Sequence, residues 1–351
     1  MKWIEWSPVP VTPTAVNILP RKYSRGLIIF SLLVFLPLAV LGTMSAGWPI
    51  HLQLLPLFIS LFIFGMPHGG ADHLILWGML KKDSLSGRIV SITLYTLAAL
   101  IYLIFWRIYP LGAALFFLGL TIFHWGQGDR YISLQLHRAN YLTRSTALTA
   151  LHILYRGSIP ILVPGFLGNE TYRAVIEALV SSSGRLSYQA QWVTNNSIFF
   201  FLIPLGLFAL YNVCSFGRIE KSERKSLWID RAEALILLIW FLFIPPLWAI
   251  GCYFVFWHSL RHTLRVLWTD QLGSQLIETG KYFRLKIRWL ELTSLMTIIA
   301  LIGMWAAFNM SFSLRGIELS WLAKALIGIS VLTLPHTIVV CFMDRLQIRS
   351  K

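Results

Sequence analysis

The sequence alternates apolar runs of about 20 residues with short polar segments that carry most of the Lys and Arg. About 20 apolar residues is the length that an α-helix needs to cross a bilayer. The composition agrees, because 56% of the residues are hydrophobic and 13% are charged, whereas soluble domains carry roughly 25% charged residues. The pattern predicts an all-α polytopic membrane protein embedded in a lipid bilayer.

We predict a bundle of about ten transmembrane helices. Eight apolar runs each fit one span: 27–47, 52–72, 88–107, 110–127, 145–165, 196–216, 289–309 and 321–343. The run 232–268 is too long for one helix, even a tilted one, and Pro245-Pro246 interrupts it. It fits either one kinked helix or two spans joined by a proline turn.

The basic residues favour two spans in this run. With ten spans, 24 of the 30 Lys and Arg residues fall on one side of the membrane. The exceptions are Arg156 within a span and, on the other side, Arg107, Arg173, Arg185, Arg315 and Lys324. Basic loops mark the cytoplasmic side, so we expect a multi-pass protein of the inner (plasma) membrane with both termini cytoplasmic. The net charge of +15 then reflects membrane orientation, and no nucleic-acid partner is expected.

This topology divides the chain into three regions and places most histidines at a similar depth in the membrane. The regions are an N-terminal cytoplasmic segment (1–26), a transmembrane catalytic domain (27–343) and a short basic C-terminal tail (344–351). Only His51 and His137 are expected in loops. The other seven histidines fall in the cytoplasmic halves of spans: His68, His73, His124, His152, His258, His262 and His336.

The segment Phe256–His262 contains two histidines four residues apart. Side chains at this spacing lie on one face of a helix, one turn above each other. His258 and His262 could therefore offer two imidazoles to one metal ion. An ionisable residue within a membrane segment is by default a hypothesis for a functional site.

The segment Pro67–His73 combines two glycines, two histidines and a carboxylate. Asp72 lies four residues from His68 and could orient its imidazole. His73 lies about 140° around a helix from His68, so both rings cannot easily face one ion, and we favour His68 as the ligand. The alternative is a helix end with a glycine cap and interfacial histidines.

The segment Phe123–Asp129 repeats the combination of histidine, glycine and carboxylate, in His124 and Asp129. A single histidine beside a tryptophan is commonly an interfacial anchor. Because His124 shares its depth with the other histidines, we interpret it as a fourth ligand of a His-rich metal site in the cytoplasmic half. His336, which follows Pro335, and Arg156 are interpreted as structural residues.

The donor set restricts the metal and the chemistry. Imidazole ligands suit iron, copper, zinc or nickel better than calcium or magnesium. No glutamate lies between His258 and His262, so the H-E-x-x-H pattern of zinc proteases is not supported. Di-iron membrane desaturases and hydroxylases would need several H-x-x-x-H or H-x-x-H-H clusters, whereas this sequence has one H-x-x-x-H motif. We therefore predict a single metal ion.

Four motifs together resemble the Brp/Blh family of membrane carotene dioxygenases. They are PHGGADH at 67–73, FHWGQGD at 123–129, HSLRH at 258–262 and LPH at 334–336. The resemblance covers about residues 60–340 and does not extend to the N-terminal segment or to the loop 166–196.

The resemblance implies a function and a cofactor. Four histidines would hold a non-haem Fe(II) ion that cleaves the central 15,15′ double bond of β-carotene with O₂ and yields two molecules of all-trans-retinal. Carried over, the catalytic metal ligands are His68, His124, His258 and His262. Asp72 and Asp129 would orient ligand N–H groups, and His73 and His336 are possible additional residues. The resemblance also implies that the retinal serves a rhodopsin.

Two functions from other classes compete with the dioxygenase. Buried histidines could relay protons or pass a metal ion in a polytopic membrane transporter, although the sequence contains no inverted repeat. Histidine pairs could also ligate haem in a membrane electron carrier, which would have a Soret absorption band.

Overall fold

In the computed structural model, the long apolar run 232–268 is divided at Ile244 and Pro245. Helix α12 (Arg224–Phe243) ends before Ile244 and Pro245, whose ψ angles are 138° and 135°, and α13 (Pro246–Tyr253) begins at the next residue. Proline lacks the N–H that a helix interior requires but is tolerated in the first turn. Trp240 Nε1–H donates to the Ala249 carbonyl at 3.1 Å and so joins the two helices. The expected break at the prolines is present, and the prediction of two membrane spans in this run stays a prediction.

The structure describes residues 21–80, 85–167, 170, 172, 174–175, 179, 196–216, 219–309, 313–314, 317–318 and 321–348. Most of the predicted segment 1–26, most of the loop 166–196 and residues 349–351 of the predicted tail lie outside these ranges. The backbone packing divides the chain into two units, and the prediction of one transmembrane domain stays a prediction. The first unit takes its described residues from 61–113 and 259–351, and the second from 19–60 and 114–258.

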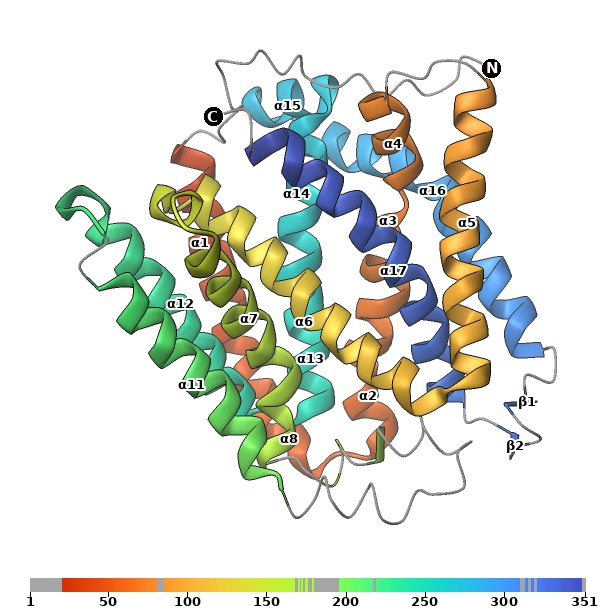
Figure 1. Ribbon diagram of the computed structural model, residues 1–351, viewed down its shortest axis with the longest axis horizontal. Coiled ribbons are helices and arrows are strands. Elements are labelled where there is room, and N and C mark those ends of the chain that lie inside the picture. Colours follow the sequence, from red (N-terminus) through yellow and green to blue (C-terminus); the bar gives the residue numbers. More distant parts are fainter. Residues whose placement is uncertain are drawn as a thin grey trace. The chain divides into compact units, whose positions relative to one another are not determined.

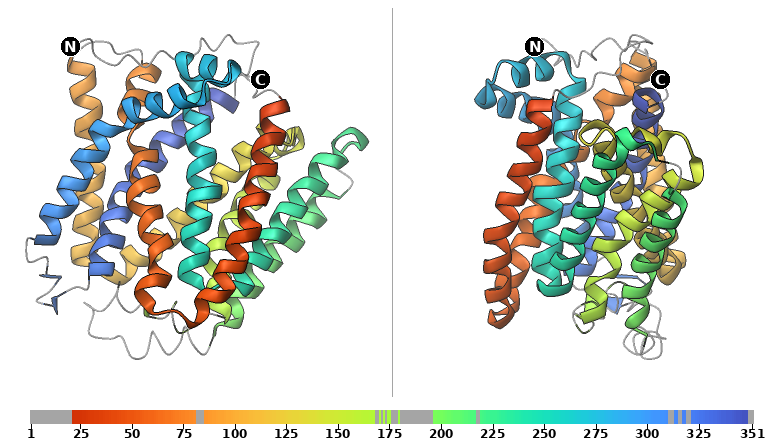
Figure 2. Two further views of the ribbon diagram at one scale, coloured as in Figure 1. Left: turned by 180° about the vertical axis from the view of Figure 1, so that it is seen from behind. Right: turned by 90° about the vertical axis from the view of Figure 1, so that its left-hand side faces the viewer.

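The second unit is built from helices that approach one another closely at glycines. Gly251 of α13 lies against α2, where an added Cβ would be 2.5 Å from the Leu57 nitrogen, and these two helices pack together (Figure 2). Helix α7 packs against α11 and α12. Besides α12 and α13, the helices of this unit are α1 (Arg21–Met44), α2 (Ile50–Ile59), most of α6 (Pro110–Gln135), α7 (Thr146–Leu162), α8 (Pro164–Leu167) and α11 (Ile198–Ser215).

The first unit is built mainly from helices on either side of residue 80 and from two long helices near the C-terminus. Helix α17 (Trp321–Ile348) packs along α5 (Leu85–Ile108) and α4 (Asp72–Leu80) (Figure 1). Asp270 caps α15 by accepting from the Gly273 N–H at 2.9 Å, and Gly280 at φ +68° ends that helix. The remaining elements are α3 (Met66–Gly69), α14 (Leu260–Thr269), α15 (Gln271–Glu278), α16 (Tyr282–Asn309), β1 (Ser313–Leu314) and β2 (Ile317–Glu318).

Seven helices among the described residues are long and apolar enough to cross a membrane. They are His51–Gly78, Leu85–Ile108, Pro110–Gln135, Thr146–Leu167, Ile198–Ser215, Tyr282–Ala306 and Ala323–Arg345. Only 17% of the most apolar window of α5 is buried within the protein, and a surface of this kind is stable against lipid. The all-α polytopic fold is confirmed, and these helices suggest a membrane protein. The count of ten spans stays a prediction, since α1, α12 and α13 are not among the seven.

Candidate metal centre

Local helix geometry sets the position of His68 in the first unit. A π-helical segment, Ser60–Gly65, leads directly into α3, which carries His68. Short π segments widen a helix locally and frequently mark functional sites. The His68 Nδ1 contacts the Gly65 carbonyl. A neutral imidazole that donates from Nδ1 keeps its lone pair on Nε2, which is the form that binds a metal.

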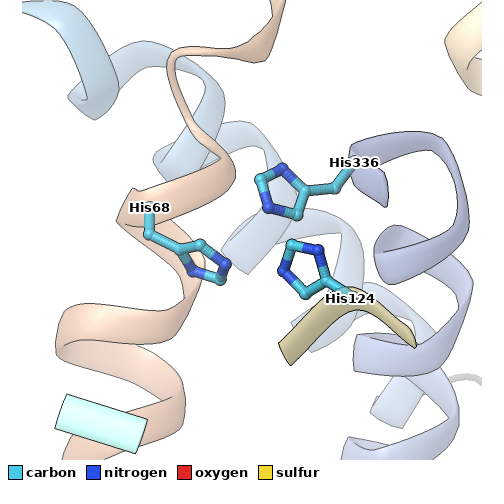
Figure 3. A group of neighbouring side chains, drawn as sticks. All are labelled: His68, His124 and His336. Atoms are coloured by element: carbon cyan, nitrogen blue, oxygen red, sulfur yellow. The ribbon is translucent and has the colours of Figure 1, made fainter. Parts of the chain in front are cut away.

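Three buried imidazoles meet in the first unit. His68, His262 and His336 come from α3, α14 and α17 and are at most 8% exposed. Their ring centroids lie 4.7 Å apart for His68 and His336, 5.2 Å for His262 and His336, and 5.4 Å for His68 and His262. Figure 3 shows the rings of His68 and His336 turned toward each other. We call this group the imidazole triad.

A buried carboxylate supports the triad. Asp72, at the start of α4, accepts from His336 Nδ1 at 2.8 Å and from the Tyr95 hydroxyl at 3.0 Å. Asp72 was predicted to orient an imidazole, and the contact that the structure gives is with His336. A Cβ on Gly69 would lie 3.4 Å from His336 Nδ1 and 3.7 Å from the carboxylate, which is ordinary van der Waals contact, so Gly69 lies directly beside this hydrogen bond.

Two further imidazoles meet in the second unit. His124 of α6 and His258, which lies in the π-helical segment Phe254–Ser259, have Nε2 atoms 3.2 Å apart and ring centroids 4.9 Å apart. His124 is also labelled in Figure 3. The rings of Phe254 and Trp125 lie 5.5 and 5.6 Å from that of His258. These apolar rings limit the access of water to the imidazoles. We call these two residues the imidazole pair.

Residues close in sequence to the imidazole pair belong to a buried network of ion pairs and hydrogen bonds. Asp129 accepts from Arg156 Nε at 2.8 Å and from Trp257 Nε1 at 3.0 Å, and Arg156 also donates to Glu233 at 2.9 Å. Asp129 was predicted to orient a ligand N–H group, and this stays a prediction. The contacts that the structure gives are hydrogen bonds from the residue before His258 and from the buried arginine. The partner of Arg156, which sequence reasoning did not identify, is thus a pair of carboxylates.

The distances within the two groups suit a metal ion. With metal–nitrogen bonds of about 2.1 Å and roughly 90–110° between ligands, two imidazoles have nitrogens about 3.0–3.4 Å and ring centroids about 4.6–5.4 Å apart. All ring separations within the triad and the pair fall in this range. The 3.2 Å between the Nε2 atoms of the pair fits both two ligands of one ion and an imidazole–imidazole hydrogen bond. The donor set therefore fits a transition metal.

The remaining histidines are placed outside these groups. The contacts given for His73 are the Gly70 carbonyl at 3.0 Å and the Trp77 ring at 5.0 Å between centroids. His152 pairs with Asp230 at 2.9 Å, and His137 lies 3.4 Å from Glu233. His51 lies within helix α2, so the expectation of a loop was wrong there, because the helix starts before it at Ile50.

His336 is the site residue that sequence reasoning undervalued. It was interpreted as structural because Pro335 beside it offered a local explanation. The signal was the LPH motif at 334–336, which stands in order with the other histidine motifs. Only the fold brings it to Asp72, which is 264 positions earlier in the chain.

Comparisons with known proteins agree on one family. A family model described as beta-carotene 15,15'-dioxygenase matches residues 59–344. The chain is 33% identical over 304 residues to the probable beta-carotene 15,15'-dioxygenase Blh of Halobacterium salinarum, which covers 83% of this chain and 84% of the relative. It is 25% identical over 293 residues to the beta-carotene 15,15'-dioxygenase of the uncultured marine bacterium 66A03, covering 82% and 93%. No solved structure matches the chain.

Proposed function

The chain belongs to the beta-carotene 15,15'-dioxygenase family, and from this premise we propose that it cleaves β-carotene at the central 15,15′ double bond with O₂. The products are two molecules of all-trans-retinal. Both atoms of O₂ end in the two aldehydes, so the reaction balances without an external reductant. The protein is thus a carotenoid-cleaving dioxygenase of a membrane.

The proposal for the cofactor is an Fe(II) ion held by His68, His124, His258 and His262. The observation that carries it is the presence of two buried imidazole groups, each with ring separations that suit one ion. An Fe(II) ion in such a donor set supplies the activation of O₂.

The residues of the chain orient the metal ligands, exclude water and position the substrate. The Gly65 carbonyl accepts from His68 Nδ1 and so favours the tautomer that presents Nε2. Apolar rings such as Trp125 and Phe254 exclude water, which suits a hydrocarbon substrate. Cleavage at the centre requires that the protein hold equal lengths of the polyene on either side of the reacting bond.

Cells that accumulate β-carotene provide the test of this function. The full chain is expressed, and pigments are extracted from cultures kept with air and without oxygen. We expect loss of the orange colour and appearance of retinal only with air. Unchanged β-carotene in aerated cells that contain the membrane-inserted, iron-loaded protein would contradict the proposal.

We further propose that the retinal serves a rhodopsin and that both termini lie in the cytoplasm. The first proposal rests on the family resemblance, and the second on the basic residues of the loops. Co-expression with a retinal-free opsin in carotene-producing cells should yield the coloured holoprotein, and an opsin that stays colourless would contradict the supply role.

Reporter fusions at both termini should be active on the cytoplasmic side, and periplasmic reporter activity would contradict the orientation.

A further inference from the structure

We propose that His336 is a further ligand of the metal ion, held in place by Asp72 and Tyr95. This inference rests on the metal centre of the proposed function. It adds a fifth imidazole, from α17, to the four histidines that the family resemblance implies.

His336 lies against two of the proposed ligands. His336 is 4% exposed, and its ring lies 4.7 Å from that of His68 and 5.2 Å from that of His262. Both separations match two imidazoles on one ion, for which about 4.6–5.4 Å is expected. A ring that only filled space beside Pro335 within α17 would have no reason to meet two proposed ligands at this spacing.

A carboxylate fixes the orientation of the His336 ring. The Nδ1 of His336 lies 2.8 and 3.0 Å from the two oxygens of Asp72, so the carboxylate holds the ring at that nitrogen. Histidines that bind a metal almost always donate their other N–H to a carboxylate, a backbone carbonyl or water. His336 with Asp72, and His68 with the Gly65 carbonyl, both follow this rule.

The Asp72 carboxylate is itself held by a hydrogen bond. The Tyr95 hydroxyl on α5 donates to Asp72 Oδ2 at 3.0 Å, and Asp72 is 2% exposed. A buried carboxylate is costly unless it is well hydrogen-bonded. Three elements, α4, α5 and α17, are thus joined to fix one imidazole, which is the arrangement expected around a ligand.

The inference changes the number of exchangeable positions on the metal. A six-coordinate ion keeps two such positions with four protein ligands and one with five. Removing His336 should therefore alter both the affinity for the metal and its visible spectrum, and neither quantity depends on turnover.

The experiment measures Co(II) binding to the full-length protein in detergent, after iron is removed with a chelator. We compare the wild type with His336→Ala, Asp72→Asn and His68→Ala, and use His51→Ala as the matched control because His51 is exposed in the second unit. We expect His336→Ala to weaken Co(II) binding by at least about 100-fold and to change the ligand-field absorption. Asp72→Asn should weaken binding by about 10–100-fold, and His51→Ala should leave it unchanged.

Added imidazole separates a ligand from a structural role. Free imidazole should restore the wild-type Co(II) spectrum to His336→Ala, since it can occupy the vacated position on the metal. Wild-type affinity and spectrum in His336→Ala would overturn the inference, and so would a loss that imidazole does not restore in a variant that elutes and melts like the wild type. If His336→Ala does not fold, Asp72→Asn decides, and wild-type affinity in that variant overturns the inference.

The His68→Ala variant distinguishes the two levels of the proposal. If His68→Ala loses the metal while His336→Ala keeps it, the fifth ligand is wrong and the proposed centre stands. If both variants bind Co(II) like the wild type, the proposed metal centre itself fails.

Discussion

At the scale of single residues, His258 is the most direct probe of the proposed centre. Its Nε2 lies 3.2 Å from that of His124, another proposed ligand. We expect His258→Ala to reduce retinal formation to below about 1% of the wild type, because loss of a ligand should cost more than the 10–100-fold of an outer hydrogen bond. Retinal is quantified by chromatography after incubation with β-carotene. Activity that survives in a folded variant would show that the ligand assignment is wrong.

Arg156 probes the buried ion pairs of the second unit. It is fully buried between Asp129 and Glu233, and removal of one member of a buried pair costs about 3–5 kcal/mol. Arg156→Ala should therefore lower the unfolding temperature strongly. Arg156→Lys should lower it less, because it keeps the charge and loses the planar fork of donors. The exposed Arg284 provides the control substitution, Arg284→Ala, and equal melting of all variants would contradict a stabilising role.

The sequence indicated which residues belong to the candidate site, but it did not indicate which residues they contact. His68, His124, His258 and His262 are all buried in the described helices, and their types and depth could be inferred from apolar runs and charge. The partners of Asp72, Asp129 and Arg156 could not, because each contact joins residues 23 to 264 positions apart. Such pairings depend on which helix faces which, and one sequence does not determine this.

At the scale of helices, the contact between α6 and α7 depends on two glycines. A Cβ on Gly126 would lie 1.9 Å from the Ile153 carbonyl oxygen, and one on Gly157 would lie 1.8 Å from that of Ile122. Small residues allow helices in membranes to approach this closely. The contact matters for the centre because His124 lies two residues before Gly126 on α6.

We expect Gly126→Ala and Gly157→Ala to destabilise the protein by about 1–3 kcal/mol or more, as overpacking does. Gly126→Ala should also lower metal content, because α6 must shift and carries His124 with it. Gly119→Ala is the matched control on the same helix, where nothing lies within 4 Å of an added Cβ. Thermal unfolding and bound iron are measured together. Normal values for Gly126→Ala would contradict the role of the close contact.

The helices themselves were more predictable than their irregularities. Pro245-Pro246 indicated the break between α12 and α13, because proline lacks the N–H that a helix interior requires. Single prolines such as Pro160 and Pro335 lie inside the continuous helices α7 and α17. The π-helical segments Ser60–Gly65 and Phe254–Ser259 carry no comparable signal. Their wider turns are set by how the flanking helices pack, and that packing is tertiary.

At the scale of the whole molecule, the fold class follows from hydrophobicity alone, and the function follows from family and site together. Apolar runs indicate membrane helices because backbone polar groups must be satisfied within each segment in lipid. Composition cannot indicate a carotenoid, since lipid-facing and substrate-facing surfaces are equally apolar. That step comes from the family, which matches residues 59–344.

The central claim is that the protein cleaves β-carotene at its centre with a histidine-bound iron. The most direct test is the amount of retinal formed per β-carotene consumed by purified protein, measured after chelation and after reloading with Fe(II) or Zn(II). We predict two retinal molecules per β-carotene with Fe(II), and no product from the chelated or Zn(II)-loaded protein, because Zn(II) has no redox chemistry. Unequal apocarotenal products, or undiminished cleavage by fully metal-free protein, would contradict this account.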